Sequence, residues 1–178
     1  MATRLPAATA AARIERSVIA TGLTYPALIE AFERELGRWD PAIGTLLIQR
    51  GASWSEVERD VERLAGPHGL MIFCRVDQGV LVSLAGTARQ CSLYLVGNPI
   101  IAQRILSVDV RACLYVPFRV SIYDDGGPEG ACIAYDWPSS FLAALGRAEL
   151  TELGALLDRK MEEVVAAVEI TARERSRQ

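Results

Sequence analysis

The 178 residues of the chain, 51% of them hydrophobic, are enough to bury one sizeable core, and this length favours a single domain over two. The charge balance of 19 Lys and Arg against 22 Asp and Glu leaves no basic excess, so nucleic acid is not an expected partner. No apolar run approaches the roughly 20 residues that a membrane-spanning helix needs, which predicts a cytoplasmic protein without membrane contact.

The amino-terminal end and the cysteines suggest no chemistry. Residues 1–12 are Ala-rich with an early Arg and lack the apolar centre of a secretory signal, so we expect a flexible tail there. The cysteines are widely spaced, form no Cys-x-x-Cys pair and have mostly apolar neighbours, which predicts reduced thiols in the core. They are Cys74, Cys91, Cys113 and Cys132. With one histidine and no paired cysteines, neither a metal site nor a cofactor is predicted.

Two helices with clear starts are predicted in the first third of the chain. Ser53 and Glu56 have the spacing of a capping box, apolar residues follow at helical spacing, and Gly66 ends the pattern. Residues 24–37 show the same layout, so two successive strand-then-helix units are expected. Strands are predicted over five runs rich in β-branched or other apolar residues, namely 14–19, 44–49, 70–76, 80–84 and 92–96.

A Gly-Asn-Pro triplet follows the last of these strands. Asn98 is a strong helix N-cap, Pro99 suits the first helical position, and Gly97 permits a tight or positive-φ turn. These preferences predict a strand-to-helix junction. Exposed N–H groups at the positive end of that helix can also hold an anion, although the structural role by itself accounts for all three residues.

The most informative strand is predicted over 114–123, where apolar and polar residues alternate almost completely and Arg119 lies on the polar face. A polar turn follows, and residues 131–136 are the returning strand of a hairpin. Pro117 interrupts the backbone donors of the first strand. It is therefore expected at a sheet edge or a bulge.

The register of this hairpin decides which side chains meet. If Ile122 and Ile133 share the core face, Asp136 falls on the face of Arg119, and the two can face each other. A slip of one residue breaks that pairing and brings Tyr135 beside Arg119 instead.

The chain closes with a helix predicted over 148–171. Its apolar residues recur every three or four positions, which is typical of a helix that covers one face of a sheet. The stripe consists of Leu150, Leu153, Leu157, Met161, Val164 and Val168. Residues 172–178 are expected to fray.

The combination of motifs after residue 90 resembles the bacterial domain-of-unknown-function family numbered three hundred and two. Its hallmarks are a Gly-Asn-Pro turn, a Leu/Val-Pro-x-Arg/Lys strand, an acidic turn and a Tyr-x-x-Pro segment. Here they are Gly97-Asn98-Pro99, Val116-Pro117-Phe118-Arg119, Asp124-Asp125 and Tyr135-Asp136-Trp137-Pro138. The resemblance covers about residues 53–168; each motif alone is weak, but their combination is specific.

The resemblance implies a small α+β domain with a largely antiparallel sheet and helices packed mainly on one face. Together with the length of the chain, we expect one such domain over 13–171, with the family-like core at about 53–168. It also implies a homodimer, and it implies no established activity. The added strand and helix before residue 53 and the long closing helix depart from the shorter members. Dimer geometry and pocket enclosure are therefore open.

One polar group of residues is the candidate ligand site. It joins the Pro-interrupted strand, the hairpin end and two helix starts, and it consists of Arg119, Asn98, Tyr115, Asp136 and Ser139. Arg119 would supply a bidentate donor for a carboxylate or phosphate. Asp136 would orient Arg119 or, if desolvated, act as a base. The alternative is a structural Arg119–Asp136 ion pair, with Ser139 capping the next helix.

Catalysis is left open by the sequence. Besides Asp136, His68 is a second catalytic candidate. Its position after Gly-Pro and before a strand also suits a polar loop residue. The usual nucleotide-binding and serine-hydrolase motifs are absent, which does not exclude an enzyme. Two functions follow: a small-molecule-binding domain for an anionic ligand, or a homodimeric interaction module without catalytic activity.

Overall fold

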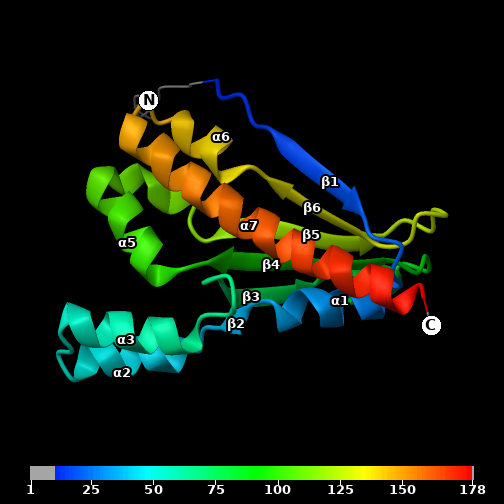
Figure 1. The fold of residues 1–178 in the computed structure, drawn as a ribbon, viewed down its shortest axis with the longest axis horizontal. Helices are drawn as coiled ribbons and strands as arrows, with labels where there is room; N and C mark the ends of the chain where they lie inside the picture. The colour runs from blue at the N-terminus through cyan, green and yellow to red at the C-terminus, as the bar shows by residue number, and fades with distance from the viewer. Residues whose placement is uncertain (1–10, 178) are drawn as a thin grey trace, which may run out of the picture.

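A six-stranded sheet with the strand order β1-β6-β5-β4-β3-β2 forms the centre of the computed structural model, which describes residues 11–177 (Figure 1). The strands are β1 Arg16–Ala20, β2 Gly37–Arg38, β3 Met71–Asp77, β4 Gln90–Gly97, β5 Phe118–Asp124 and β6 Cys132–Asp136. Neighbouring strands run antiparallel except β2 and β3, which are parallel. The tail predicted over 1–12 lies largely outside the described residues.

Helices lie mainly on one face of this sheet, as expected. They are α1 Tyr25–Arg34, α2 Pro41–Gln49, α3 Trp54–Leu64, α4 Gln78–Ser83, α5 Pro99–Val108, the short 3₁₀ helix η1 Val110–Leu114, α6 Pro138–Ala143 and α7 Ala148–Arg175. In Figure 1, α7 crosses in front of the sheet between α5 and α1. No helix within residues 11–177 combines the length and apolar content that crossing a bilayer requires. The helices and the mostly antiparallel sheet together confirm the predicted α+β class.

The closing helix packs as its pattern predicts. All six stripe residues from Leu150 to Val168 are buried, and α7 continues to Arg175, beyond the predicted end at 171. Across the sheet, Phe118, Val120 and Ile122 of β5 are buried, because their side chains face this helix layer. The hydrophobic core therefore lies between the sheet and the layer of α1, α5 and α7.

The β5–β6 hairpin has the predicted register. Ile122 lies opposite Ile133, and Tyr135 is buried, so Asp136 lies on the same face as Arg119. The strand itself begins at Phe118 rather than at residue 114. Pro117 immediately precedes β5, a central strand that pairs with β4 without a register shift, so the prediction of an edge or a bulge is wrong; its missing N–H falls outside the ladder.

Two of the predicted strands are helices. Residues 44–49 belong to α2, which Asp40 starts by accepting a hydrogen bond from the N–H of Ala42 at 2.9 Å. Residues 80–84 fall on α4, where Asp77 accepts from the N–H of Val80 at 3.3 Å. Short apolar runs do not distinguish a strand from a helix by periodicity, and an acidic N-cap precedes each of these two helices.

The α2–α3 hairpin, residues 41–64, leaves and rejoins the body of the protein at one point. The N–H groups of Gly37 and Gly66 both donate to the carbonyl oxygen of Leu70, at 2.9 and 3.0 Å. A Cβ on Gly37 would lie 1.9 Å from the carbonyl oxygen of Leu64, and a Cβ on Gly66 would lie 2.6 Å from the nitrogen of Gly37. Only glycine allows the two backbone segments to approach so closely.

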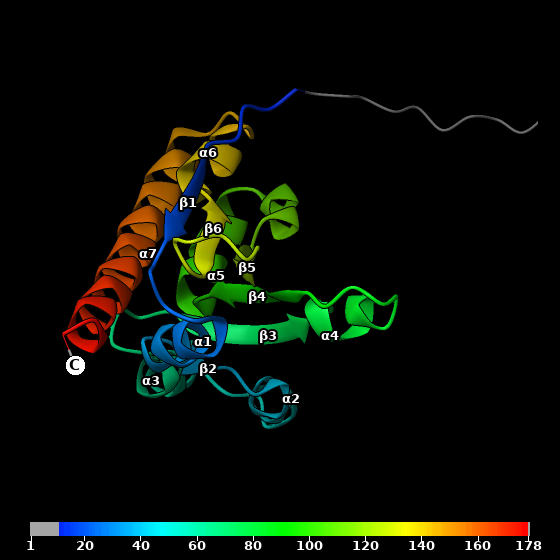
Figure 2. The ribbon, with the colours of Figure 1, turned by 90° about the vertical axis from the view of Figure 1, so that its right-hand side faces the viewer.

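The sheet face opposite α7, called here the uncovered face, has no helix packed on it in the described part of the chain. Figure 2 shows α7 on one side of the sheet, with α4 projecting on the other. The side chains of this face include Arg16, Val18, Leu93, Arg119, Ser121, Ala134 and Asp136.

The four cysteines are free, but Cys74 and Cys113 are exposed, so the prediction that all four lie in the core is wrong.

Candidate functional site

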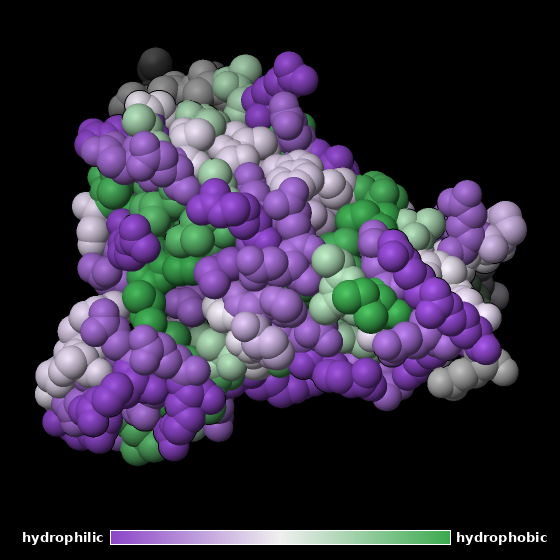
Figure 3. Space-filling view, viewed as in Figure 1, coloured by the Kyte–Doolittle hydropathy of each residue, from purple (hydrophilic) through white to green (hydrophobic). Residues whose placement is uncertain are grey.

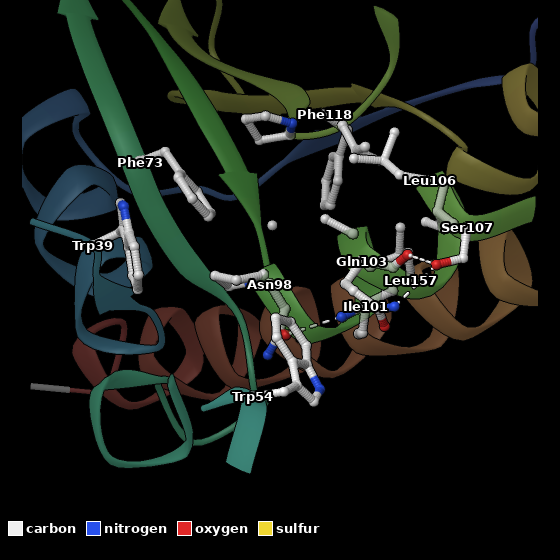
Figure 4. A pocket seen from close by; sticks show the side chains of 16 residues that line it. Trp39, Trp54, Phe73, Asn98, Ile101, Gln103, Leu106, Ser107, Phe118 and Leu157 are labelled. Atoms are coloured by element: carbon white, nitrogen blue, oxygen red, sulfur yellow. Dashed lines mark hydrogen bonds between the residues drawn. The ribbon is translucent and has the colours of Figure 1, made fainter. Parts of the chain in front are cut away.

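A cavity of about 540 Å³ opens between α5, the α2–α3 hairpin and the junction of β4 with α5 (Figure 4). This volume lies within the range typical of small-molecule sites, about 300–1,000 Å³. Figure 3 shows apolar surface over α5 and in the hollow between α5 and the α2–α3 hairpin. We call this space the apolar cavity.

Aromatic rings form one wall of the apolar cavity. Trp39 and Phe73 lie with ring centroids 5.9 Å apart and an interplanar angle of 32°. The backbone N–H of Trp39 donates to the carbonyl of Ile72 at 2.9 Å, which fixes the start of the hairpin against β3. The ring of Trp39 rests on α2, where a Cβ on Gly44 would lie 3.2 Å from it. This wall is therefore held by both the sheet and the hairpin.

The facing wall belongs to α5 and the start of β5. Ile101 and Ile105 of α5 are buried, and Phe118 of β5 stands beside them with only 2% of its surface exposed. Figure 4 shows Ile101, Leu106 and Phe118 across the opening from Trp39 and Phe73. Leu157 of α7 closes the inner end. Every one of these contacts is apolar.

Gly97 shapes the floor of the apolar cavity. It does not take a positive φ, as the turn interpretation allowed, but ends β4 in extended backbone. A Cβ there would lie 3.3 Å from Cβ of Pro117 and 3.5 Å from the ring of Phe73. The residue is therefore small because Pro117 and Phe73 meet over it.

Asn98 is an N-cap whose side chain is fully used within the fold. Its Oδ1 accepts from the N–H groups of Ile100 and Ile101 at 2.8 and 3.2 Å, and its Nδ2 donates to the carbonyl of Gly69 at 2.8 Å. The N–H of Ala102 already donates to the backbone oxygen of Asn98. Since proline has no N–H, the first turn of α5 has no donor left for an anion.

Apart from Asn98, the polar side chains that line the apolar cavity are Gln103 and Ser107, which are exposed at its mouth. Gln103 Nε2 donates to Ser107 Oγ at 2.9 Å, and Ser107 Oγ donates to the backbone oxygen of Gln103 at 2.9 Å. Trp54 is 43% exposed at the rim and donates its indole N–H to Glu58 at 2.8 Å. No residue lining the cavity is charged.

Arg119, Tyr115 and Asp136 lie together in a second hollow, on the uncovered face. This crevice, of about 470 Å³, shares the segment Val116–Phe118 with the apolar cavity, so that segment is the wall between the two spaces. Tyr115 stacks on Phe141 with centroids 5.2 Å apart. Asn98 lines the apolar cavity instead. Four of the five predicted ligand-site residues are thus divided between two hollows.

Asp136 forms its ion pair with Arg16 of β1 rather than with Arg119. Arg16 Nε lies 2.6 Å from Oδ1 of Asp136, and this hydrogen bond raises the pKa of the Arg16 guanidinium. Asp136 pairs with Arg16 because β1 pairs with β6 in a register that places Arg16 directly opposite Asp136. Arg119 faces the crevice beside them.

Ser139 and His68 line neither hollow. Trp137, not Ser139, is the N-cap of α6, and the N–H of Ser139 donates to Asp158 of α7 at 3.0 Å. His68 lies between two glutamates, with Nε2 3.1 Å from Glu35 and Nδ1 3.5 Å from Glu163. Both residues therefore make contacts that join α7 to its neighbours.

The aromatic wall is what sequence reasoning missed. Trp39, Trp54 and Phe73 are far from the Gly-Asn-Pro triplet in the chain, and no local pattern links them to it. The available signal was Trp54 itself, a large aromatic residue at the first position of a helix whose other residues are mostly polar. Its 43% exposure follows only from the structure.

Comparison with known proteins identifies the family and the fold. A model of the family described as "Domain of unknown function DUF302" matches residues 45–168. An uncharacterised conserved DUF302 protein from Bacillus stearothermophilus has a similar solved structure, with a TM-score of 0.61 and 13% identity over 86% of this chain and 97% of that one. No curated protein matches. The family match covers more than half of the chain, which therefore belongs to the DUF302 family.

Proposed function

We propose that the protein binds a small molecule in the apolar cavity. The observation that carries this proposal is a hollow of about 540 Å³ with an aromatic wall, open to solvent beside a 43% exposed tryptophan. A concave apolar site of this size with a few polar groups at its mouth is the common form of a ligand site.

Filling the cavity with a side chain is expected to abolish this binding. Ala102 lines the cavity, so Ala102→Phe places a ring inside it. The neutral fluorescent probe N-phenyl-1-naphthylamine reports binding by its emission increase. We expect the variant to weaken the probe's affinity about tenfold or more, the equivalent of about 1.4 kcal/mol.

The matched control is Ala143→Phe, which adds the same ring at an exposed position of α6 outside the cavity. It is expected to bind the probe as the unchanged protein does. Equal probe affinity in both variants, with both folded by circular dichroism, would remove the apolar cavity as the binding site.

Self-association over the uncovered face is the second candidate function. Nine of the thirteen exposed large hydrophobic side chains in the described chain belong to β1 and its lead-in, to β3–α4, or to η1. They are Ile14, Val18, Val76, Val80, Leu81, Val82, Leu84, Val110 and Leu114. Exposed apolar side chains that gather on one side of a molecule often mark an interaction site.

A second copy of the chain is the partner that this surface fits. One molecule offers both an apolar projection, α4, and an apolar floor, formed by Val18, Leu93 and Ala134 (Figure 2). In a two-fold symmetric dimer both copies use the same surface, so this one surface supplies both halves of the interface. The Arg16–Asp136 pair would lie within or beside such an interface.

A charge on α4 is expected to dissociate this dimer. Leu81 is 72% exposed, and Leu81→Asp would leave an unpaired carboxylate in the contact. Light scattering after size exclusion should report nearly twice the 19.4 kDa of one chain for the unchanged protein and one chain for the variant. The control is Ile48→Asp on α2, also exposed at 82% but outside this surface. A monomeric unchanged protein would exclude this candidate.

A further inference from the structure

We infer that the ligand of the apolar cavity is an uncharged molecule with an aromatic ring, inserted between the Trp39–Phe73 pair and α5. This inference rests on the proposed function and names its ligand class. It differs from the expectation of an anionic ligand, which concerns Arg119 on the far side of Val116–Phe118.

The absence of charge in the lining carries the first step. None of the residues that line the apolar cavity is Asp, Glu, Lys, Arg or His. Burying an ionised group without a partner costs far more than burying a neutral polar group. The first turn of α5, whose N–H groups would otherwise be available to an anion, is already capped by Asn98. A charged ligand would therefore lose its hydration without recovering any ionic contact.

The interior of the apolar cavity also needs no hydrogen-bonding group from a ligand. Within residues 11–177, no buried side-chain nitrogen or oxygen lacks a hydrogen-bond partner. The side-chain amide of Asn98 is hydrogen-bonded to α5 and to Gly69, and the indole N–H of Trp54 donates to Glu58. The inner surface can thus be covered entirely by hydrocarbon.

The aromatic wall favours a ring over a flexible chain. Trp39 and Phe73 are tilted by 32° with centroids 5.9 Å apart, and Phe118 stands on the opposite side of the same space. A planar ring between these walls can make offset-stacked or edge-to-face contacts, which stabilise beyond the area they bury. It also loses less conformational freedom on binding than an alkyl chain.

The mouth of the cavity allows one neutral hydrogen bond. Gln103 donates one amide hydrogen to Ser107 and is exposed, so its side-chain oxygen can accept from a ligand. A single O–H or N–H on the outward edge of the ring suits this position. The ligand class is then a neutral aromatic molecule with one polar group facing solvent.

Two probes that differ only in charge test the first part. N-phenyl-1-naphthylamine and 8-anilinonaphthalene-1-sulfonate share one skeleton, and the second adds a sulfonate. Titrations use the full chain, and binding counts only as the part that Ala102→Phe removes and Ala143→Phe retains. We expect the neutral probe to bind about tenfold or more tightly than the sulfonate.

A second pair tests the ring. 1-Naphthol and decahydro-1-naphthol have the same carbon skeleton and hydroxyl, but only the first is aromatic. We expect 1-naphthol to displace the neutral probe at a concentration about three- to tenfold lower. Equal displacement by the saturated alcohol would overturn the aromatic part of the inference.

The possible failures are distinguishable. If neither probe binds to a folded protein, the proposed function fails and the inference falls with it. If the sulfonate binds as tightly as the neutral probe, the cavity is a ligand site but its ligand is not restricted to neutral molecules, which overturns the inference alone. If sulfonate binding instead persists in Ala102→Phe and is weakened by Arg119→Met, the anion is held in the Arg119 crevice, as the sequence suggested, and the apolar cavity keeps its selectivity for the neutral probe, as inferred.

Discussion

Replacing Gly37 with alanine is expected to destabilise the protein by about 3 kcal/mol or more, at the upper end of the cost of overpacking. The added Cβ would lie 1.9 Å from the carbonyl oxygen of Leu64 and 2.8 Å from the nitrogen of Gly66. Both atoms are backbone, so no side chain can rotate away. The α2–α3 hairpin must then separate from Leu70, whose carbonyl holds both glycines. Urea unfolding followed by circular dichroism measures the loss.

Gly127→Ala is the matched control for this substitution. Gly127 has no positive φ, it lies in the exposed turn between β5 and β6, and its Cβ would meet only the side chain of Asp125. We expect a change within about 0.5 kcal/mol. A Gly37→Ala variant as stable as the Gly127→Ala variant would mean that the two backbone segments do not meet at the base of the hairpin.

The same glycine contact links stability to the apolar cavity. Trp39 follows Gly37 by two residues, and Trp54 begins the returning helix, so both rim aromatics are placed by this one junction. A partial loss of the contact should loosen the aromatic wall before the sheet unfolds. Binding of the neutral probe is therefore expected to fall in Gly37→Ala even under conditions where circular dichroism still reports a folded chain.

The sequence predicted the parts of the fold that depend on local patterns. The capping box of Ser53 and Glu56 starts α3, with the N–H of Ser53 donating to Glu56 at 2.8 Å. Alternation along β5 predicted which residues face the core, and the pairing of Ile122 with Ile133 is one of the two registers that the sequence left open. In each case the signal lies within a few residues, so periodicity and capping preferences were sufficient.

Predictions failed where tertiary context decided. The run at 44–49 has the composition of a strand, yet it lies in α2, after the chain has left the sheet at the end of β2. The partner of Asp136 depended on the place of β1 in the sheet, which no local pattern specifies. The apolar cavity joins residues from 39 to 157, so its lining follows from topology alone.

The Gly-Asn-Pro triplet has one contact that the sequence predicted and one that it did not, and both belong to Asn98. Variants of Asn98 separate the two by experiment. Capping of α5 was predictable from residue type, whereas the bond from Nδ2 to Gly69 joins segments 29 residues apart. Asn98→Ala removes both and is expected to lower the free energy of unfolding by about 2–3 kcal/mol. Asn98→Ser keeps the capping oxygen and loses only the Gly69 bond, so about half of that loss is expected.

Thermal and urea unfolding of the two Asn98 variants, with Asp40→Ala as a comparison, distinguish a structural from a ligand-binding role. Asp40 caps α2 through one hydrogen bond, so its loss is expected to cost about 1 kcal/mol. If Asn98 only holds the junction, affinity for the neutral probe should fall in step with stability, from Asn98→Ser to Asn98→Ala. Lost affinity at unchanged stability in Asn98→Ser would instead mean that the amide contacts the ligand directly, and the fully bonded side chain described above would have to rearrange on binding.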